Sequence, residues 1–365
     1  LGIFGRGATA KLDVVPGKKL DNNYSTNTVD LCPVGALTDK RFRFKSRVWF
    51  LKRAESVCPG CSRGCNMFID YNLAPINKVG QKRIYRFKPR HNADVNHYWM
   101  CDYGRYLFPQ TDENRLLVRV GAGLAPARPF DAIANRLRAS GPIAVLLSRR
   151  STNESLWAAK RFFSQVIHPA DLTSDVPSGG PPDEDAILLK ADKYPNTKGA
   201  ELLGAAGSKS GEVILKAAAD GKYGALVVVD HDLPALYGEL AARAISKTPF
   251  VLYLATHQTA TAPLAHAILP IAMFSEQDGS FTNFEGRVQR IHQAVAPAGE
   301  AQPEWAIWTA LAKALGEDWP EKSAEDWLAS IATLVPGFEG VTRESIGPGG
   351  VVVGHDLPAP TRKRW

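Results

Sequence analysis

Hydrophobic and polar positions follow two different patterns along the chain. From about residue 111 onward, short all-apolar runs at residues 143–147, 225–229 and 250–254 alternate with segments of helical periodicity. A short, continuous apolar run is typical of a strand that is buried on both faces of a parallel sheet. Because strands here alternate with helices, the pattern predicts an α/β fold with a doubly wound, mainly parallel sheet.

Capping and turn signals place helices between these strands. A helical pattern opens at Arg128 and ends at the stop signal Ser140-Gly141-Pro142. Ser151 and Glu154 have the spacing of a capping box, which predicts the start of another helix. A further helix is expected over residues 235–247.

The N-terminal third has a different pattern. From Lys40 to Arg53, basic residues alternate with apolar ones, which predicts a strand with one basic and one apolar face. Basic residues interleaved with aromatic ones also occur in proteins that bind single-stranded nucleic acid. No recognition module surrounds this segment, so we expect a solvated or subunit-facing strand and no nucleic-acid partner.

The distribution of charged residues along the chain adds a prediction about binding partners. The 365 residues are 45% hydrophobic and 22% charged, as expected for a globular protein of two or three domains. Residues 1–110 contain 19 Lys and Arg against 8 Asp and Glu, whereas the remainder contains 25 against 29, so the basic part predicts an acidic partner or a bound anionic group. No apolar run reaches the roughly 18 residues of a membrane span. The N-terminus has no signal-peptide pattern, which favours the cytosol.

The candidate chemistry lies in four of the five cysteines, Cys58, Cys61, Cys65 and Cys101, which we call the four-cysteine set. Their spacing is C-x2-C-x3-C-x35-C. A short loop with three thiolates, joined by one distant thiolate, suits a cubane [4Fe–4S] cluster, because each sulfur can reach a different iron. Structural zinc sites usually consist of two separated pairs of ligands. Zinc and disulfides remain the alternatives.

The fifth cysteine, Cys32, is followed by Pro33, a combination that closes ferredoxin-type cluster motifs. No companion cysteine precedes it. Either Cys32 is an ordinary buried thiol, or its partners lie before Leu1 and the chain is N-terminally truncated. Because the first residue is not Met, we expect truncation.

Residues 28–50, which include Cys-Pro-Val-Gly-Ala-Leu, closely resemble the large iron–sulfur subunit of bacterial respiratory complex I. They also resemble the related diaphorase subunit of NAD-linked hydrogenases. The resemblance implies that Cys32 is the last ligand of a [4Fe–4S] cluster whose other ligands come from the missing N-terminus. The hydrogenase subunit typically ends soon after this point and this chain continues, which favours complex I.

Residues 53–110 resemble the small Fe–S domain that opens the molybdopterin oxidoreductases. In the large iron–sulfur subunit of some bacterial complexes this domain binds an extra cluster, remote from the main electron path, and the four-cysteine set matches its ligands one for one. His91 and His97 lie in the same segment. We consider them as alternative ligands and expect them to be surface or packing residues.

The motif E-x-x-G-x-F-T-N-x-E-G-R-V-Q, from Glu276 to Gln289, also resembles this superfamily, where it packs near the pterin-binding crevice. We expect it to form a structural hairpin. No cysteine follows Cys101 and the C-terminal barrel of molybdopterin enzymes is missing, so molybdopterin is not expected. We interpret Asp230-His231-Asp232, at the end of a predicted strand, as surface loop residues.

Together the pattern and the resemblance imply four parts: residues 1–52, a C-terminal remnant of a ferredoxin-like [4Fe–4S] domain; 53–113, a molybdopterin-oxidoreductase-type [4Fe–4S] domain; 114–320, the α/β domain; and 321–365, a C-terminal helix and an extended tail. The tail is expected to dock on a neighbouring subunit.

The implied function is an electron-transfer subunit of NADH:quinone oxidoreductase, without a complete active site of its own. Its partners would be the NADH-binding and quinone-side Fe–S subunits of the peripheral arm. The protein would be cytoplasmic, held at the inner face of the plasma membrane by the complex. The alternatives are a fragment of a formate dehydrogenase-like molybdopterin enzyme, a subunit of an NAD-linked hydrogenase, and a zinc-stabilised interaction module.

Overall fold

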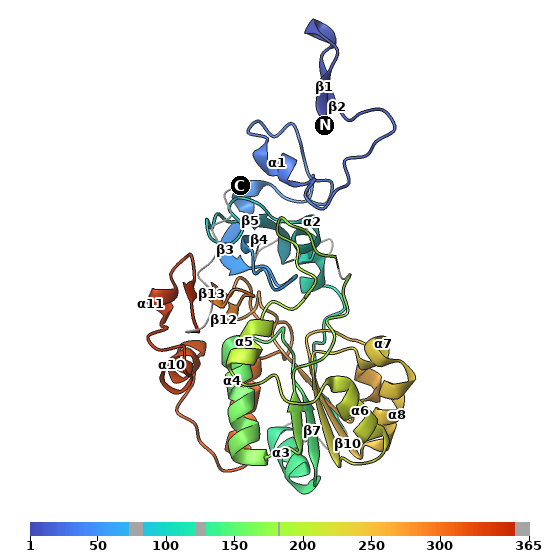
Figure 1. The fold of residues 1–365 in the computed structure, drawn as a ribbon, viewed down its shortest axis with the longest axis vertical. Coiled ribbons are helices and arrows are strands. Elements are labelled where there is room, and N and C mark those ends of the chain that lie inside the picture. Colours follow the sequence, from blue (N-terminus) through green and yellow to red (C-terminus); the bar gives the residue numbers. More distant parts are fainter. Residues whose placement is uncertain (73–82, 122–128, 182, 355–365) are drawn as a thin grey trace.

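A six-stranded sheet forms the centre of the computed structural model, which describes residues 1–72, 83–121, 129–181 and 183–354 (Figure 1). The strand order is β6-β11-β10-β9-β7-β8, and all neighbours are parallel except β6, which is antiparallel to β11. The strands span Val120–Gly121 (β6), Ile143–Leu146 (β7), Asp171–Thr173 (β8), Ala225–Val229 (β9), Phe250–Ala255 (β10) and Ala267–Pro270 (β11). The prediction of a doubly wound, mainly parallel sheet is confirmed.

Helices cover both faces of this sheet because successive strand residues point to opposite sides. Val145 and Val227 pack with one group of helices, while Leu146 and Val228 pack with the other. The first group is α3 (Pro129–Ala139), α4 (Asn153–Phe162), α9 (Glu304–Ala314) and α10 (Ala324–Leu334). The second group is α6 (Gly211–Ala219), α7 (Leu233–Tyr237) and α8 (Glu239–Lys247). The two groups lie on opposite sides of β7 and β10 in Figure 1.

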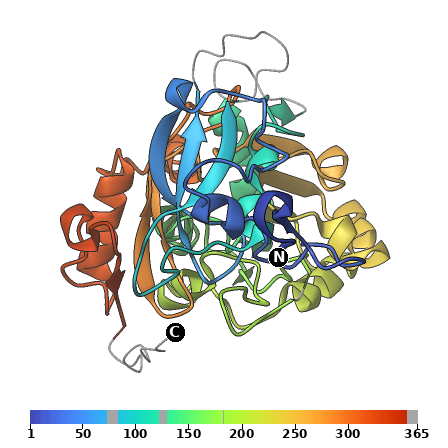
Figure 2. The ribbon, with the colours of Figure 1, turned by 90° about the horizontal axis from the view of Figure 1, so that it is seen from above.

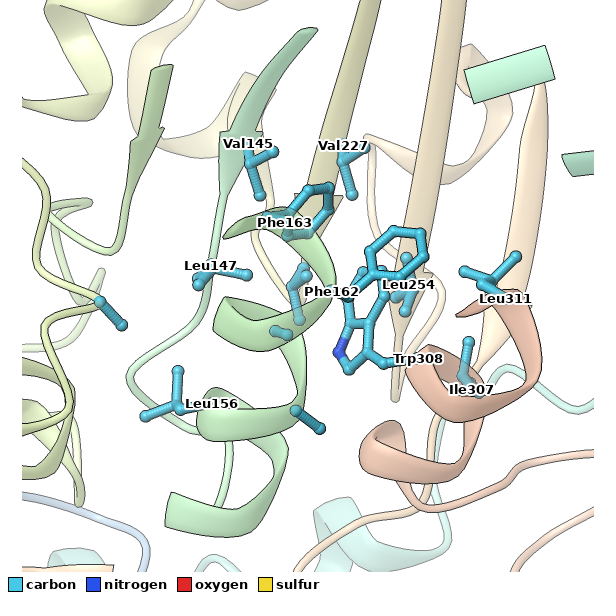
Figure 3. Packing of buried hydrophobic residues seen from close by; sticks show 14 of the residues in the cluster. Val145, Leu147, Leu156, Phe162, Phe163, Val227, Leu254, Ile307, Trp308 and Leu311 are labelled. Carbon is cyan, nitrogen blue, oxygen red and sulfur yellow. The ribbon is translucent and has the colours of Figure 1, made fainter. Parts of the chain in front are cut away.

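Aromatic side chains fill the core under the first group. Phe162 and Phe163 pack against Trp308, with ring centroids 5.6 and 5.3 Å apart. Phe163 lies beside Val145 and Val227, and Trp308 lies beside Leu254 (Figure 3). Each of these side chains is at most 1% exposed. Truncation of such an aromatic residue to Ala typically costs about 3–5 kcal/mol of stability, so this cluster fixes α4 and α9 on the sheet.

The helix boundaries agree with the sequence signals to within a residue or two. α3 ends just before Gly141, whose φ of 72° breaks the helix as predicted. The expected capping box at Ser151 is wrong by one residue, because Thr152 caps α4 with a hydroxyl that accepts from the Ser155 N–H at 3.2 Å. The Ser151 hydroxyl instead donates to Glu304, 2.6 Å away.

Two further helical segments differ from expectation. The helix expected over residues 235–247 is a pair, α7 and α8, separated by Gly238 at a φ of 55°. α4 continues into one π-helical turn, η4 (Phe163–Ile167), before His168 adopts a left-handed conformation.

Two small antiparallel sheets lie beyond one end of the central sheet. One contains β3 (Lys52–Val57), β4 (Asn66–Tyr71) and β5 (Ile84–Pro89). The other contains β12 (Gly279–Thr282), β13 (Arg287–Ile291) and β14 (Val351–Val352). β13 packs against β3, so the two sheets lie side by side, blue and orange in Figure 2. The predicted hairpin of the Glu276–Gln289 motif is confirmed, and Gly286 supplies its turn with a φ of 77°.

The N-terminal segment projects from the β3–β5 sheet (Figure 1). Its elements are β1 (Gly2–Phe4), η1 (Gly7–Thr9), β2 (Lys11–Asp13), α1 (Asn27–Leu31) and η2 (Val48–Phe50). The predicted strand from Lys40 to Arg53 is wrong, because turns and η2 occupy most of it and only its last two residues lie in β3. Its basic and apolar side chains are not separated onto two opposite faces. The Arg41 guanidinium lies over the Tyr106 ring at 4.1 Å, and the Arg86 guanidinium lies over the Phe42 ring at 4.0 Å.

Short helices complete the described chain: α2 (Asp102–Arg105), η3 (Phe108–Thr111), α5 (Thr197–Leu202), η5 (Ala262–Leu264) and α11 (Arg343–Ile346). Within the described part of the chain, none of the helices has the length and apolar character to cross a bilayer. Of the predicted docking tail, residues 347–354 are described and include β14, which pairs with β13, while residues 355–365 lie outside the described residues. The four domain boundaries stay predictions.

Candidate metal centre

Three members of the four-cysteine set lie on one tight hairpin loop, residues 58–65, which we call the cysteine loop. β3 and β4 flank this loop, with Val57 paired to Asn66. The Cys58 N–H donates to the Cys65 carbonyl at 2.8 Å and closes the loop at its base. The sheet therefore fixes the positions at which the first and third cysteines leave it.

The fourth member, Cys101, reaches the loop from a different element. It is the N-cap residue of α2, and its sulfur accepts from the Gly104 N–H at 3.4 Å. A Cβ on Gly104 would lie 2.6 Å from the Cys58 sulfur and 3.6 Å from the Cys101 sulfur. Both sulfurs therefore lie against the same glycine, which leaves room for them because it has no side chain.

All four thiols are buried, with 4–5% of each residue exposed. Burial is the largest cause that raises the pKa of each thiol, that of Cys101 to about 11. For Cys58 and Cys65 the neighbouring thiols raise the pKa further, since several thiolates cannot share one buried region. A bound cation removes this penalty because metal binding displaces the thiol protons.

Backbone amides point at the sulfurs and act against this penalty. The Gly60 N–H lowers the pKa of Cys58, and the N–H groups of Lys190 and Arg63 lower the pKa of Cys61. Hydrogen bonds from N–H groups to thiolate sulfur favour the charged form. Such bonds to the sulfurs are one of the ways in which proteins tune iron–sulfur clusters.

In the described residues, no group of three or more His, Cys, Asp or Glu side chains is arranged to hold a single metal ion. Tetrahedral zinc needs four ligands that converge on one point. A cubane places a separate iron opposite each thiolate, so its ligands surround a larger volume. All five cysteines are free thiols, which disagrees with the disulfide alternative. Whether the set holds a cluster or zinc, and its role as ligand, stay predictions.

Two distant segments hold the cysteine loop from outside. The first is residues 183–194, which we call the strap. The Asp192 carbonyl of the strap accepts from the Ser62 N–H at 2.9 Å, and the Lys190 N–H reaches Cys61. Leu188 enters the core of the β3–β5 sheet. The strap therefore covers the part of the cysteine loop that lies between Cys61 and Cys65.

The second segment is the β12–β13 hairpin with its E-G-R-V-Q motif. The Gln289 side-chain amide donates to the Gly64 carbonyl at 2.9 Å, and the Phe284 N–H donates to the Ser62 carbonyl at 2.9 Å. The Asn283 amide donates to the Arg63 carbonyl at 3.4 Å. The motif was interpreted as structural, and its contacts show the structural role: it binds and orients the backbone carbonyls of the cysteine loop.

Cys32 lies apart from the four-cysteine set, just after α1, and is partly exposed. The backbone N–H of Leu37 is the largest of several amide contacts that lower the pKa of its thiol. Its loop therefore presents donors to a sulfur anion. The structure does not bring Cys32 together with the other four cysteines, and its ligand role stays a prediction.

α1 is nevertheless tied to the segment around Cys101. The Asn27 side chain donates to the Met100 carbonyl at 3.0 Å and accepts from the Met100 N–H at 3.2 Å. Arg105 pairs with Asp30 at 2.7 Å. Of the two histidines of this region, exposed His91 stacks its ring on Tyr98 at 4.2 Å, and the backbone of His97 forms a β-bridge with Asn92.

A cavity of about 590 Å³ lies at the carboxyl ends of β7, β9 and β10 and reaches the cysteine loop through Pro59 and Tyr103. We call it the crevice. Among the described residues, its charged lining consists of Glu113, Arg150, Asp230, Asp232 and Glu304. This lining is mainly acidic, with one arginine.

Sequence reasoning missed two buried groups of the crevice. His231, interpreted as a surface residue, is 2% exposed and donates from Nε2 to the Leu147 carbonyl at 2.9 Å, and burial lowers its pKa to about 4. Glu304 is 2% exposed, and burial raises the pKa of its carboxyl to about 7. The only sequence signal was their position at a strand end and a helix start.

Two family models match the chain. The model for the ferredoxin-like domain of NADH-quinone oxidoreductase subunit 3 matches residues 1–38, and the molybdopterin oxidoreductase model matches residues 209–314. The first match includes Cys32. The second includes β9, β10 and the β12–β13 hairpin that holds the cysteine loop.

Curated relatives carry two kinds of names. An NADH-quinone oxidoreductase subunit of Streptomyces coelicolor is 34% identical over 179 residues, 47% of this chain and 20% of the relative. A putative formate dehydrogenase of Staphylococcus aureus is 43% identical over 88 residues, 24% of this chain and 9% of the relative. One of Staphylococcus haemolyticus is 37% identical over 103 residues, 28% of this chain and 10% of the relative. The chain thus spans about a tenth to a fifth of the length of these relatives.

Among solved structures, acetylene hydratase from Pelobacter acetylenicus is similar at 21% identity and a TM-score of 0.34, covering 48% of this chain and 24% of that one. The family models give the class of two parts of the chain: residues 209–314 match the molybdopterin oxidoreductases, and residues 1–38 match a ferredoxin-like domain. The chain is similar to the streptomycete NADH-quinone oxidoreductase subunit, and the resemblance seen in its sequence is confirmed.

Proposed function

We propose that this protein is an electron-transfer subunit that holds a [4Fe–4S] cluster on Cys58, Cys61, Cys65 and Cys101. The observation that supports this most is the burial of four thiols from two elements, with the Cys58 and Cys101 sulfurs against the same glycine and backbone amides directed at the sulfurs. A cluster in this position supplies one-electron transfer and needs no substrate pocket. The chain itself excludes water and supplies the hydrogen bonds that tune the potential.

The proposed context is NADH:quinone oxidoreductase. The similarity to the streptomycete subunit supports a place among the NADH-binding and quinone-side iron–sulfur subunits of the peripheral arm. The complex would hold the protein at the cytoplasmic face of the plasma membrane. Cys32 would complete a second [4Fe–4S] cluster with ligands from residues before Leu1, which the match to the ferredoxin-like domain supports.

Iron and acid-labile sulfide analysis on anaerobically purified protein tests this proposal directly. We expect about four irons and about four sulfides per chain and a cubane EPR signal after reduction. Cys101→Ser should lose most of this iron. Cys32→Ser is the matched control and should keep it. One zinc per chain without sulfide, or unchanged iron in Cys101→Ser, would contradict the ligand assignment.

The second candidate is a formate dehydrogenase-like enzyme, which the names of the staphylococcal relatives favour. The crevice fits a pterin dinucleotide poorly, because carboxyl groups outnumber the one arginine of its described lining and would repel the diphosphate. Cysteine is absent from the same described lining. Molybdenum or tungsten by elemental analysis, together with formate-dependent dye reduction, would favour this candidate.

A further inference from the structure

Lys193 is a lysine with no exposed surface, at the end of the strap that covers the cysteine loop. Lysine is among the residue types that are almost never fully buried unless they are paired. Its side chain packs under Gly180, where a Cβ would lie 2.8 Å from Lys193 Cγ. The chain therefore leaves space for this lysine in its interior.

The Lys193 ammonium is held by oxygens that carry no formal charge. Nζ donates to the Asp183 carbonyl at 2.9 Å and to the Lys190 carbonyl at 2.5 Å. Nζ also lies 5.3 Å from the ring centroid of Tyr103. Among the described residues, no carboxylate forms an ion pair with Lys193. Its positive charge is therefore oriented but not neutralised by a direct partner.

The Tyr103 ring connects this ammonium to the cysteine loop. Tyr103 Cε1 would lie 3.3 Å from a Cβ on Gly60, so the ring touches the loop between Cys58 and Cys61. The neighbouring strap residue Asp192 is bonded to Ser62 of the same loop. Lys193 is thus a buried cation that lies across one aromatic ring from the thiols.

The charges around the four sulfurs have both signs. Arg63 brings a positive charge within the cysteine loop itself, and Lys193 brings one beside Tyr103. Asp192, whose carbonyl bonds Ser62, and Asp102, which follows Cys101, bring negative charges. Lys193 differs from the others because it is fully buried, where solvent and salt screen a charge least.

We propose that Lys193 is a positioning residue that raises the reduction potential of the cluster held by the four-cysteine set. This rests on the proposed function. Reduction adds one electron and therefore one negative charge to a site that already holds four thiolates, without proton transfer or a change of ligands. A nearby buried cation stabilises the added charge.

EPR-monitored redox titration of the intact chain, with dithionite as reductant, tests the proposal. In Lys193→Gln we expect reduction to become about tenfold less favourable, a shift of about 59 mV to more negative potential for one electron. The shift should persist in concentrated salt because the charge is buried. Lys190→Gln is the matched control: its side chain is 26% exposed and pairs with Glu184, and its backbone N–H to Cys61 is retained.

A second variant, which removes a negative charge instead of a positive one, keeps the proposal testable if Lys193→Gln does not fold. Asp192→Asn keeps the backbone carbonyl that bonds Ser62 and removes the negative charge next to Cys61. We expect its potential to become less negative. An unchanged potential in folded, iron-loaded Lys193→Gln, or an equal shift in Lys190→Gln, would overturn the proposal. If Lys193→Gln does not fold, an unchanged or more negative potential in Asp192→Asn overturns it.

Iron content separates this inference from the proposed function. Wild-type protein without iron and sulfide defeats the proposed function, whatever the variants do. Wild-type and Lys193→Gln proteins with equal iron but equal potentials leave the cluster in place and defeat only the role of Lys193.

Discussion

The side-chain amide of Gln289 donates to the Gly64 carbonyl at 2.9 Å, although the two residues are 225 positions apart. The same amide nitrogen donates to the Asn66 side-chain oxygen at 2.7 Å, so both of its hydrogens are used. Gln289 is 1% exposed. The shape of the cysteine loop therefore depends on a hairpin that lies much later in the chain.

Gly64→Ala tests how tightly this contact is packed. Gly64 has a φ of 64°, and a Cβ there would lie 2.7 Å from Gln289 Oε1 and 3.1 Å from Asn283 Cβ. We expect a loss of about 2–4 kcal/mol in the free energy of unfolding, from backbone strain plus the clash. Denaturant unfolding measures this loss, and iron content shows whether the loop still holds the proposed cluster.

The matched control for this variant is Gly221→Ala. Gly221 has a similar φ of 75°, but nothing in the described chain lies within 4 Å of its Cβ position. This substitution carries the backbone strain alone, about 1–2 kcal/mol. Equal losses in the two variants would mean that the contact between Gly64 and the hairpin contributes nothing.

Gln289→Ala tests the hydrogen bonds themselves. It leaves the buried Gly64 carbonyl unpaired, which costs about 1–3 kcal/mol, whereas the Asn66 amide oxygen keeps the bond that the Asn92 amide donates to it at 2.8 Å. We expect lower stability and faster loss of iron to a chelator. Gln293→Ala, at an exposed position just after β13, should match the wild type in both measurements. Iron release at the wild-type rate from Gln289→Ala would disprove the role of the hairpin.

Sequence patterns predicted those parts of the fold that depend on local chemistry. The buried strands β7, β9 and β10 were predicted because each is apolar throughout, and a central parallel strand requires this. The cysteine spacing indicated the candidate site because three ligands share one loop. The family resemblance followed from motifs whose residues lie within a few positions of each other.

The contacts that shape the site could not be predicted in this way. The strap and Lys193 lie more than 100 residues after the cysteine loop, and no local pattern links them to it. The alternation from Lys40 to Arg53 predicted a strand, but Arg41 and Phe42 pack on rings and guanidinium groups of neighbouring segments instead. Tertiary contacts of this kind override periodicity.

Glu276→Ala tests the buried ion-pair network that Glu276 forms with Arg115 and Arg83. Glu276 has no exposed side-chain surface and accepts from Arg115 at 2.7 Å through both oxygens, while Arg83 donates to it at 2.7 Å. Its removal leaves buried Arg115 without a counter-charge, and we expect a loss of about 3–5 kcal/mol in denaturant unfolding. The partly exposed pair Arg119–Glu300, 3.7 Å apart, supplies the control. Glu300→Ala should cost at most about 1 kcal/mol, and a similar cost for Glu276→Ala would contradict the prediction.

The last prediction concerns pH and Glu304. Burial raises the pKa of this carboxyl from 4.5 to about 7, although the Ser151 hydroxyl and the Trp308 indole N–H donate to it at 2.6 and 3.0 Å. Below about pH 4.5 the carboxyl is protonated in both the folded and the unfolded chain and costs nothing. As the pH rises toward 7, only the unfolded chain ionises, so the folded state loses up to about 3 kcal/mol and the loss then levels off.

Glu304→Gln removes this ionisation and keeps a neutral side chain of the same shape. We expect the variant and the wild type to have similar stability near pH 5, and the variant to become more stable by about 1–3 kcal/mol at pH 8. His231, whose pKa is lowered to about 4, destabilises both chains as the pH falls below 6.5 and cancels in the difference. Guanidinium unfolding across this pH range measures the difference, with exposed Glu317→Gln as control. Parallel curves for the variant and the wild type would show that Glu304 ionises as readily in the folded chain as in the unfolded one.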